Sequence, residues 1–201
     1  MEAKKDIEAT PELLGNLLLV RVVEEIDILH SICEEYGIKV NESQDVKIFQ
    51  ELFIFYFSLF LLVLSSRDIR DINDDEMKEY GKLFLTEARI ALFNSELPNI
   101  YKEWILDENL FIKIFDRDFR FYYHDQIPFL EKEPLEEAMQ LCRCEKENTL
   151  QYWAVKFQYQ ICKILNVLTD ILPFMRLWGR CSAIIPEFVS MVLADIRPVL
   201  K

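Results

Sequence analysis

The sequence predicts an all-α fold: a single-domain helical bundle of six to eight helices, spanning residues 1–201, around a central hydrophobic helix. Three observations lead to this prediction. Hydrophobic residues make up 51% of the 201 positions, which is enough for a sizeable core and argues against disorder. Glycine occurs four times, too rarely for the tight turns of an all-β fold. Most segments also place hydrophobic side chains three to four residues apart, the spacing of one helix face.

The central helix is predicted from the segment LFIFYFSLFLLVL, residues 52–64, in which Ser58 and the hydroxyl of Tyr56 are the polar groups. Extended to Ser66, the segment is about 22 Å long as a helix, at about 1.5 Å per residue. A bilayer core is about 30 Å thick and needs roughly 20 apolar residues. Charged residues close the segment at both ends. We therefore expect a buried core helix and no membrane insertion.

Proline, glycine and capping residues set the boundaries of the other helices. Thr10 followed by Pro11 is a typical helix start, and Gly37 is a typical helix end. The central helix is expected to begin between Asn41 and Asp45. Later helices are expected from Asp74 or Asp75 to before Pro98, from Pro98 to Ile105, from Pro134 onward, from Leu150 to Pro173, and between Pro186 and Pro198, with Gly179 connecting two helices.

The segment FIKIFDRDFRFYYH, residues 111–124, fits two alternatives. A helix places Phe111, Phe115 and Phe119 on one face. A hairpin around DRD suits the aromatic and β-branched residues, which favour strands. The helix is preferred, but the sequence leaves residues 111–123 open between helix and hairpin.

The chain is acidic, with a net charge of −12, and its charge is unevenly distributed. Residues 1–100 hold 10 basic against 20 acidic side chains, whereas residues 151–201 hold 6 against 3. An acidic surface repels phosphate backbones and anionic lipids, so nucleic acid is a poor partner. We expect instead a homodimer, or binding to another protein, in which the basic C-terminal segment meets an acidic surface.

The predicted interface lies in this C-terminal segment. The segment mixes aromatic, methionine and arginine side chains, the types that are enriched at protein interfaces. The candidate interface residues are Arg176, Trp178, Arg180 and Met191. The alternative is that the segment packs on its own bundle.

The cysteines indicate the compartment. The five of them (Cys33, Cys142, Cys144, Cys162 and Cys181) form an odd, irregularly spaced set. The first residues, MEAKKDIEATPELL, hold no apolar stretch of the kind that a secretory signal has. We therefore expect a soluble, cytoplasmic protein whose cysteines are reduced thiols.

No metal and no cofactor is expected. Cys142, Cys144 and His124 lack the fourth ligand and the usual cysteine spacing of a structural zinc site. Residues 71–82 begin like a calcium loop but have a glutamate where glycine is needed and a lysine at the final glutamate position. The glycines stand too far apart for a phosphate-binding loop.

Arg117 and His124 are weak catalytic candidates. The pattern Arg117-Asp118-x5-His124 resembles the arginine, polar residue, histidine motif of HEPN-type helical ribonucleases. That family consists of all-α bundles in which these residues work at a dimer interface. The resemblance covers eight residues and implies that His124 moves a proton while Arg117 steadies phosphate charge.

Three functions are consistent with these patterns. Because no complete catalytic motif is present, we expect a cytosolic protein-interaction or regulatory module that self-associates. The alternative is a helical bundle that binds an apolar small ligand among its 15 phenylalanines, through residues that the sequence does not identify. The second alternative is an enzyme, either a HEPN-like ribonuclease or a metal-dependent nucleotide hydrolase. The latter follows from a resemblance to the histidine and aspartate order of metal-dependent phosphohydrolases at His30, His124-Asp125 and Asp170.

Overall fold

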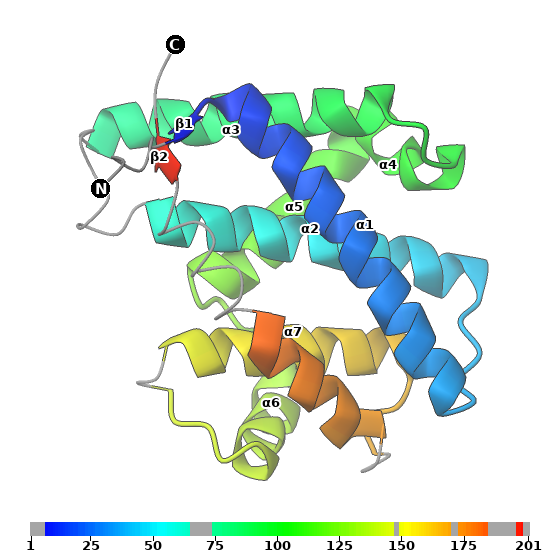
Figure 1. Cartoon of the computed structure of the whole chain (residues 1–201). Coiled ribbons are helices and arrows are strands. Elements are labelled where there is room, and N and C mark those ends of the chain that lie inside the picture. Colours follow the sequence, from blue (N-terminus) through cyan, green and yellow to red (C-terminus); the bar gives the residue numbers. More distant parts are fainter. Residues whose placement is uncertain (1–6, 65–73, 147–148, 170–172, 185–195, 199–201) are drawn as a thin grey trace, which may run out of the picture.

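Helix α2 (Glu42–Leu64) lies at the centre of the computed structural model, with other helices packed around it (Figure 1). The structure describes residues 7–64, 74–146, 149–169, 173–184 and 196–198. The remaining elements are β1 (Ile7–Ala9), α1 (Pro11–Glu35), α3 (Asp74–Asn94), η1 (Asn99–Tyr101), α4 (Glu103–Leu106), α5 (Glu108–Tyr123), α6 (Phe129–Leu141), α7 (Thr149–Leu165) and β2 (Ile196–Pro198). A further helix covers residues 173–184. The predicted all-α class, with a central hydrophobic helix, is confirmed.

Helix α2 is buried on every side over its middle part. All residues from Glu51 to Phe60 are buried, and α1, α5 and α7 contact the helix. The hydroxyl of Ser58 donates to the carbonyl of Ile54 at 2.7 Å, so the polar group inside the apolar run is satisfied. By length and composition alone α2 is able to cross a membrane, and 72% of its most apolar window is buried inside the structure.

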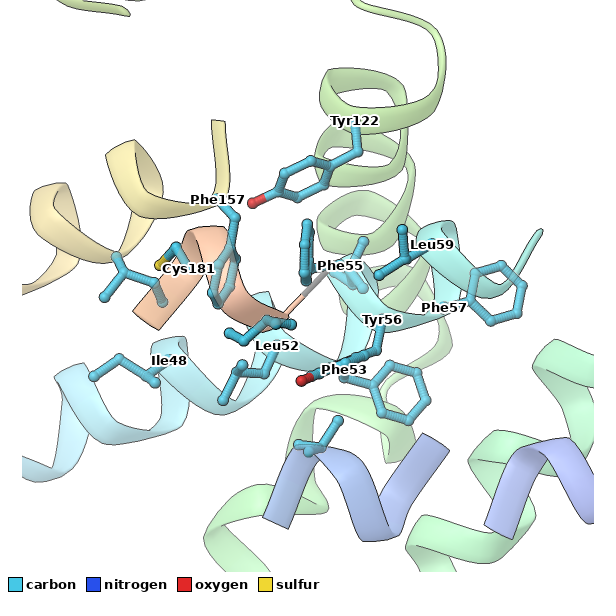
Figure 2. Close-up of a cluster of buried hydrophobic side chains, with 14 of the residues drawn as sticks. Ile48, Leu52, Phe53, Phe55, Tyr56, Phe57, Leu59, Tyr122, Phe157 and Cys181 are labelled. Carbon is cyan, nitrogen blue, oxygen red and sulfur yellow. The ribbon is translucent and has the colours of Figure 1, made fainter. Parts of the chain in front are cut away.

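Aromatic rings of α2 face those of the neighbouring helices (Figure 2). The ring of Phe55 stacks on Phe157 of α7 at 4.2 Å and meets the edge of Tyr122 of α5 at 5.3 Å. The ring of Phe57 stacks on Phe84 of α3 at 4.7 Å. Aromatic pairs at such distances add about 0.5–1.5 kcal/mol beyond their area burial. These rings fill the core by contacting one another, and they tie three helices to α2.

Helix α1 begins and ends where the sequence predicts. The hydroxyl of Thr10 accepts from the amide of Leu13 at 3.2 Å, and Gly37 has a φ of 66° just after the helix. Figure 1 shows α1 running diagonally across α3 and α2. A Cβ added at Gly15 would lie 2.8 Å from the amide nitrogen of Ala88 on α3. The missing side chain therefore allows the close crossing of α1 and α3.

The segment that sequence reasoning left open, residues 111–123, belongs to helix α5, so the hairpin alternative is wrong. The side chain of Asp107 caps this helix by accepting from the amides of Asn109 and Leu110, both at 3.0 Å. Along one face, the rings of Phe111, Phe115, Phe119 and Tyr123 stack in sequence at 5.5, 5.5 and 5.1 Å. The four-residue spacing of these aromatics, combined with the cap, explains why the helix forms.

Two predicted boundaries at prolines are wrong. Helix α6 begins at Phe129 and contains Pro134, which costs one backbone hydrogen bond near its N-terminal end. Helix α7 ends at Leu165 and not at Pro173. Asn166 takes a φ of 59°, and the amide of Val167 then binds the carbonyl of Cys162 at 2.9 Å. This left-handed turn caps α7 before proline is reached.

The C-terminal part also differs from expectation. Gly179 lies within the helix of residues 173–184 and therefore does not connect two helices. Pro198 belongs to strand β2, which pairs in parallel with β1, in a register that sets Ile7 opposite Ile196 and Ala9 opposite Pro198. The rest of the helix predicted between Pro186 and Pro198 lies outside the described residues.

Candidate functional site

Two buried carboxyl groups lie at the floor of a cleft of about 600 Å³ between α2, α5, α6 and α7. Glu51 of α2 is 4% exposed and Asp118 of α5 is 6% exposed. The other charged or amide side chains that line this cleft are Asn41, Gln44, Lys47, Gln50, Arg117, Glu131, Gln160, Lys163 and Asn166. We call it the Glu51 cleft. Buried acids in a cleft are the kind of group that functional sites use.

Helix α5 brings its side chains to Glu51 by simple periodicity. Asp118 and Tyr122 are four residues apart and therefore share one helix face. The hydroxyl of Tyr122 donates to Oε1 of Glu51. The guanidinium of Arg117 holds Asp118 through both carboxylate oxygens, at 2.5 and 2.6 Å. Such a two-pronged contact is among the stronger hydrogen-bonded ion pairs.

The two acids have different electrostatic surroundings. Burial raises the pKa of Glu51 to about 8, and repulsion from Asp118 adds to this, while Tyr122, Arg117 and Lys163 oppose it. Burial also raises the pKa of Asp118, and here the hydrogen-bonded Arg117 opposes the effect most strongly. Glu51 is therefore the group that holds a proton at pH 7, while its neighbour is paired with a cation.

The opposite wall of the Glu51 cleft is also paired. Glu131 of α6 accepts from Lys163 at 2.6 Å and from Gln160 at 3.1 Å, both on α7. The amide of Gln44 on α2 donates to the carbonyl of Ile164 at 2.8 Å. These bonds join α6 and α2 to α7 at the cleft.

A second polar cluster surrounds Asp125, in the turn between α5 and α6. Its carboxylate accepts from Lys146 at 2.7 Å, Tyr152 at 2.7 Å and Lys156 at 2.9 Å. The side chain of Lys156 is fully buried, with its ammonium 4.9 Å from the ring centres of Phe121 and Tyr152. The three donors lower the pKa of Asp125 to about 2, against the effect of burial, which alone would raise it.

The Asp125 cluster holds a strained turn in place. Asp125 has a φ of 53°, in the left-handed region that non-glycine residues seldom adopt. Its bonds to Tyr152 and Lys156 fasten this turn to α7. Lys146, Tyr152 and Lys156 all bind the carboxylate of Asp125 and hold the turn in place, so we assign the cluster a structural role.

The predicted catalytic residues do not meet in one site. Arg117 lines the Glu51 cleft and binds Asp118, whereas His124 is exposed at the end of α5 and is not among the residues that line the cleft. The ring of His124 meets Phe119 and Tyr123 edge-on, at 5.7 and 5.4 Å.

The residues of the phosphohydrolase-like order are also dispersed. His30 binds Asp45 at 2.7 Å, and the hydroxyl of Tyr101 donates to the same carboxylate. Asp125 belongs to the cluster described above, and Asp170 lies outside the described residues. Within the described ranges, no group of three or more His, Cys, Asp or Glu side chains is arranged to hold a metal ion.

The predicted interface residues have different surroundings. Arg180 donates to buried Glu25 of α1 at 3.0 and 2.7 Å, and Arg176 lies 3.8 Å from Glu35, also on α1. Trp178 is partly buried against the core. Met191 lies outside the described residues. At Arg176 and Arg180, the basic C-terminal segment therefore pairs with acidic residues of α1 in the same chain.

No known protein family, no curated protein and no solved structure matches the chain.

Proposed function

We propose that the chain is a cytoplasmic interaction module that self-associates as a dimer. The observation that carries this proposal is a pair of adjacent side chains, Phe129 and Leu130, at the start of α6, which are 84% and 85% exposed. Single exposed apolar residues are common on protein surfaces, but two neighbours this exposed are typical of an interface anchor. We call Phe129 and Leu130 the apolar pair.

A groove between α3 and α4 offers a place for such an anchor. It has a volume of about 260 Å³. Its apolar lining consists of Ile90 and Phe93 from α3 with Ile105 and Leu106 from α4, and three of these four side chains are exposed in the isolated chain. A groove with such a lining gains free energy when an apolar side chain displaces its water.

The charge of the groove suits a second copy as the partner. The lining of the groove includes no acidic residue, and its Arg89 is paired with Glu108 at 2.7 Å, so the groove does not repel an acidic segment. The apolar pair lies on an acidic helix, because α6 carries four glutamates and one lysine. Insertion of each copy's pair into the other's groove gives a twofold dimer, the commonest oligomer of soluble proteins.

The test uses two double variants and light scattering coupled to size exclusion. Phe129→Ser with Leu130→Ser removes the pair, and Phe93→Ser with Leu106→Ser removes the groove. Each variant should be monomeric at a concentration where the parent protein is a dimer. An equimolar mixture of the two should form dimers again, because one intact pair then meets one intact groove.

Val20→Ser is the matched control, since Val20 is an exposed apolar residue on α1 outside both surfaces. This variant should behave like the parent protein. A parent protein that stays monomeric at about 100 μM, a concentration at which micromolar dimers are well populated, contradicts the proposal. So does a mixture of the two double variants that stays monomeric.

A further inference from the structure

We propose that the Glu51 cleft binds a small organic anion with an apolar body, and that its acid group sits at Glu51 while its body lies along Ile114, Phe121 and Ile164. All four residues line the cleft. This inference is independent of self-association, because the Glu51 cleft shares no lining residue with the groove between α3 and α4.

The geometry of Glu51 leaves one oxygen for a ligand. Tyr122 donates to Oε1, and no further hydrogen bond to Glu51 is found within the described part of the chain. In that part, every side-chain oxygen or nitrogen that is fully buried has a hydrogen-bond partner. Because the second oxygen of Glu51 has no such partner, it is not fully buried, and we infer that it is reached from the cleft that Glu51 lines, although the residue as a whole is 4% exposed.

The charge balance of the cleft favours an anion over a cation. Asp118 forms an ion pair with Arg117, and Glu131 forms one with Lys163, so neither pair adds net charge to the cleft. Lys47 also lines the cleft and forms no ion pair within the described residues, which leaves one positive charge in excess when Glu51 is neutral. A bound ammonium group would add to this excess, whereas a carboxylate offsets it.

A neutral Glu51 is also the right hydrogen-bonding partner for an anion. Its pKa of about 8 leaves it protonated at pH 7, so its hydroxyl donates to an acceptor. The charged and titratable groups that face it are Lys47 from α2, Arg117, Asp118 and Tyr122 from α5, Glu131 from α6 and Lys163 from α7. As the pH rises through 8, Glu51 becomes a carboxylate and repels the ligand.

The apolar part of the lining indicates what kind of acid fits. Ile114, Phe121, Pro128 and Ile164 provide hydrocarbon surface beside the polar floor. Binding sites for small molecules commonly combine such an apolar lining with a few polar groups that fix the orientation. A medium-chain carboxylate matches this combination better than an inorganic anion does.

The experiment compares octanoate with octylammonium by isothermal titration calorimetry, at pH 6.5 and pH 9.5. Octanoate should bind at pH 6.5, and its affinity should fall about tenfold or more at pH 9.5, where a group with a pKa near 8 is largely ionised. Octylammonium, which has the same chain and the opposite charge, should bind at least tenfold more weakly at pH 6.5. Preference for octylammonium, or no octanoate binding, would overturn the proposal.

Glu51→Gln tests whether the ionisation of Glu51 causes the pH dependence of octanoate binding, because the substitution keeps the size of the side chain and removes its titration. Glutamine keeps a neutral donor, so this variant should bind octanoate equally well at both pH values. Lys47→Ala at the exposed rim should weaken octanoate binding several-fold, and Lys113→Ala, an exposed lysine of α5 outside the cleft, should not. If Glu51→Gln keeps the pH dependence of the parent protein, or if both lysine variants behave alike, the assignment of the site is wrong.

Discussion

Glu51 and Asp125 are both carboxyl groups that accept a hydrogen bond from a tyrosine, yet they have opposite charge states. The pKa of Glu51 is raised to about 8, and that of Asp125 is lowered to about 2. Asp125 has two lysines in direct contact, whereas Glu51 has no cation bound to it. Asp125, which is partly exposed and has bound cations, works as an ionic anchor, while Glu51, which is buried without them, becomes a neutral hydrogen-bonding group.

Glu25 is a buried carboxyl that does have a bound cation, and it gives the most severe test of this comparison. It is 2% exposed and binds Arg180 through both oxygens. Arg180→Glu would place a second carboxylate against it, and we expect a loss of about 3 kcal/mol or more in the free energy of unfolding. Urea denaturation measures this loss.

The matched control is Arg176→Glu, which changes an exposed arginine whose acid partner is 3.8 Å away and equally exposed. We expect it to change the free energy of unfolding by no more than about 0.5 kcal/mol. It should also leave the dimer intact if the dimer forms through the apolar pair. A stable Arg176→Glu variant that becomes monomeric would instead favour the interface that the sequence predicts.

Asp125→Asn tests the ionic anchor. Asparagine tolerates the left-handed backbone of this position, so the substitution removes the charge and leaves the turn. Lys156 then remains buried without its counter-charge, and we expect a loss of about 2–3 kcal/mol at pH 7, reduced from the value for a fully buried pair because Asp125 is partly exposed.

The pH dependence of this loss has a defined sign. Because the pKa of Asp125 is lower in the folded than in the unfolded chain, its ionic contribution is present above about pH 4 and disappears as the pH falls toward 2. Denaturation of the parent protein and the Asn variant at pH 7 and pH 3 should therefore give converging stabilities. An equal difference at both pH values would contradict the assignment.

Glu51→Gln should stabilise the folded chain at neutral pH, whereas Asp125→Asn should destabilise it. Since the pKa of Glu51 is higher in the folded chain, the folded state binds more protons between about pH 4.5 and 8, and the parent protein loses stability across that range. The variant carries no such group, so its advantage should grow by at most about 1.4 kcal/mol per pH unit up to pH 8 and then level off. A difference in stability between variant and parent that stays constant from pH 5 to pH 8 would contradict the raised pKa of Glu51.

The sequence patterns that predict the fold are local, and this explains where they succeed. Hydrophobic spacing and the Thr10 cap define α1, and the apolar run defines α2. The errors come from local signals that compete with each other. Proline at position 134 predicts a helix start there, but the helix begins earlier, at Phe129. Asn166 ends α7 before Pro173 by adopting a left-handed backbone conformation, which the presence of an asparagine does not by itself predict.

The polar clusters are harder to predict from the sequence than the helices are. Glu51 stands three residues after buried Ile48 and four before buried Phe55, so it lies on an apolar helix stripe. Lys156 lies four residues after Tyr152 on a similar stripe. A charged residue at such a position indicates a buried partner. The partner itself cannot be predicted from local pattern, because Tyr122 is 71 residues from Glu51 along the chain.

Among the substitutions at the two acids and their partners, the smallest expected effects come from the two tyrosines, and they sharpen the comparison most directly. Tyr122→Phe removes the hydroxyl that donates to Glu51, so a buried acid loses its one bound donor, and we expect a cost of about 1–2 kcal/mol. Tyr152→Phe leaves Asp125 with both lysines and should cost less, about 0.5–1 kcal/mol.

The two substitutions should also differ in their effect on ionisation. The bond from Tyr122 lowers the pKa of Glu51, so the Tyr122→Phe variant should go on losing stability above pH 8, where the parent protein levels off. Tyr152→Phe should leave that range unchanged, because it acts on a carboxylate that its lysines already hold ionised. Stability measured from pH 5 to pH 9.5 for both variants separates the two acids. Identical pH profiles would mean that Glu51 and Asp125 are not electrostatically distinct, since each tyrosine would then matter only for packing.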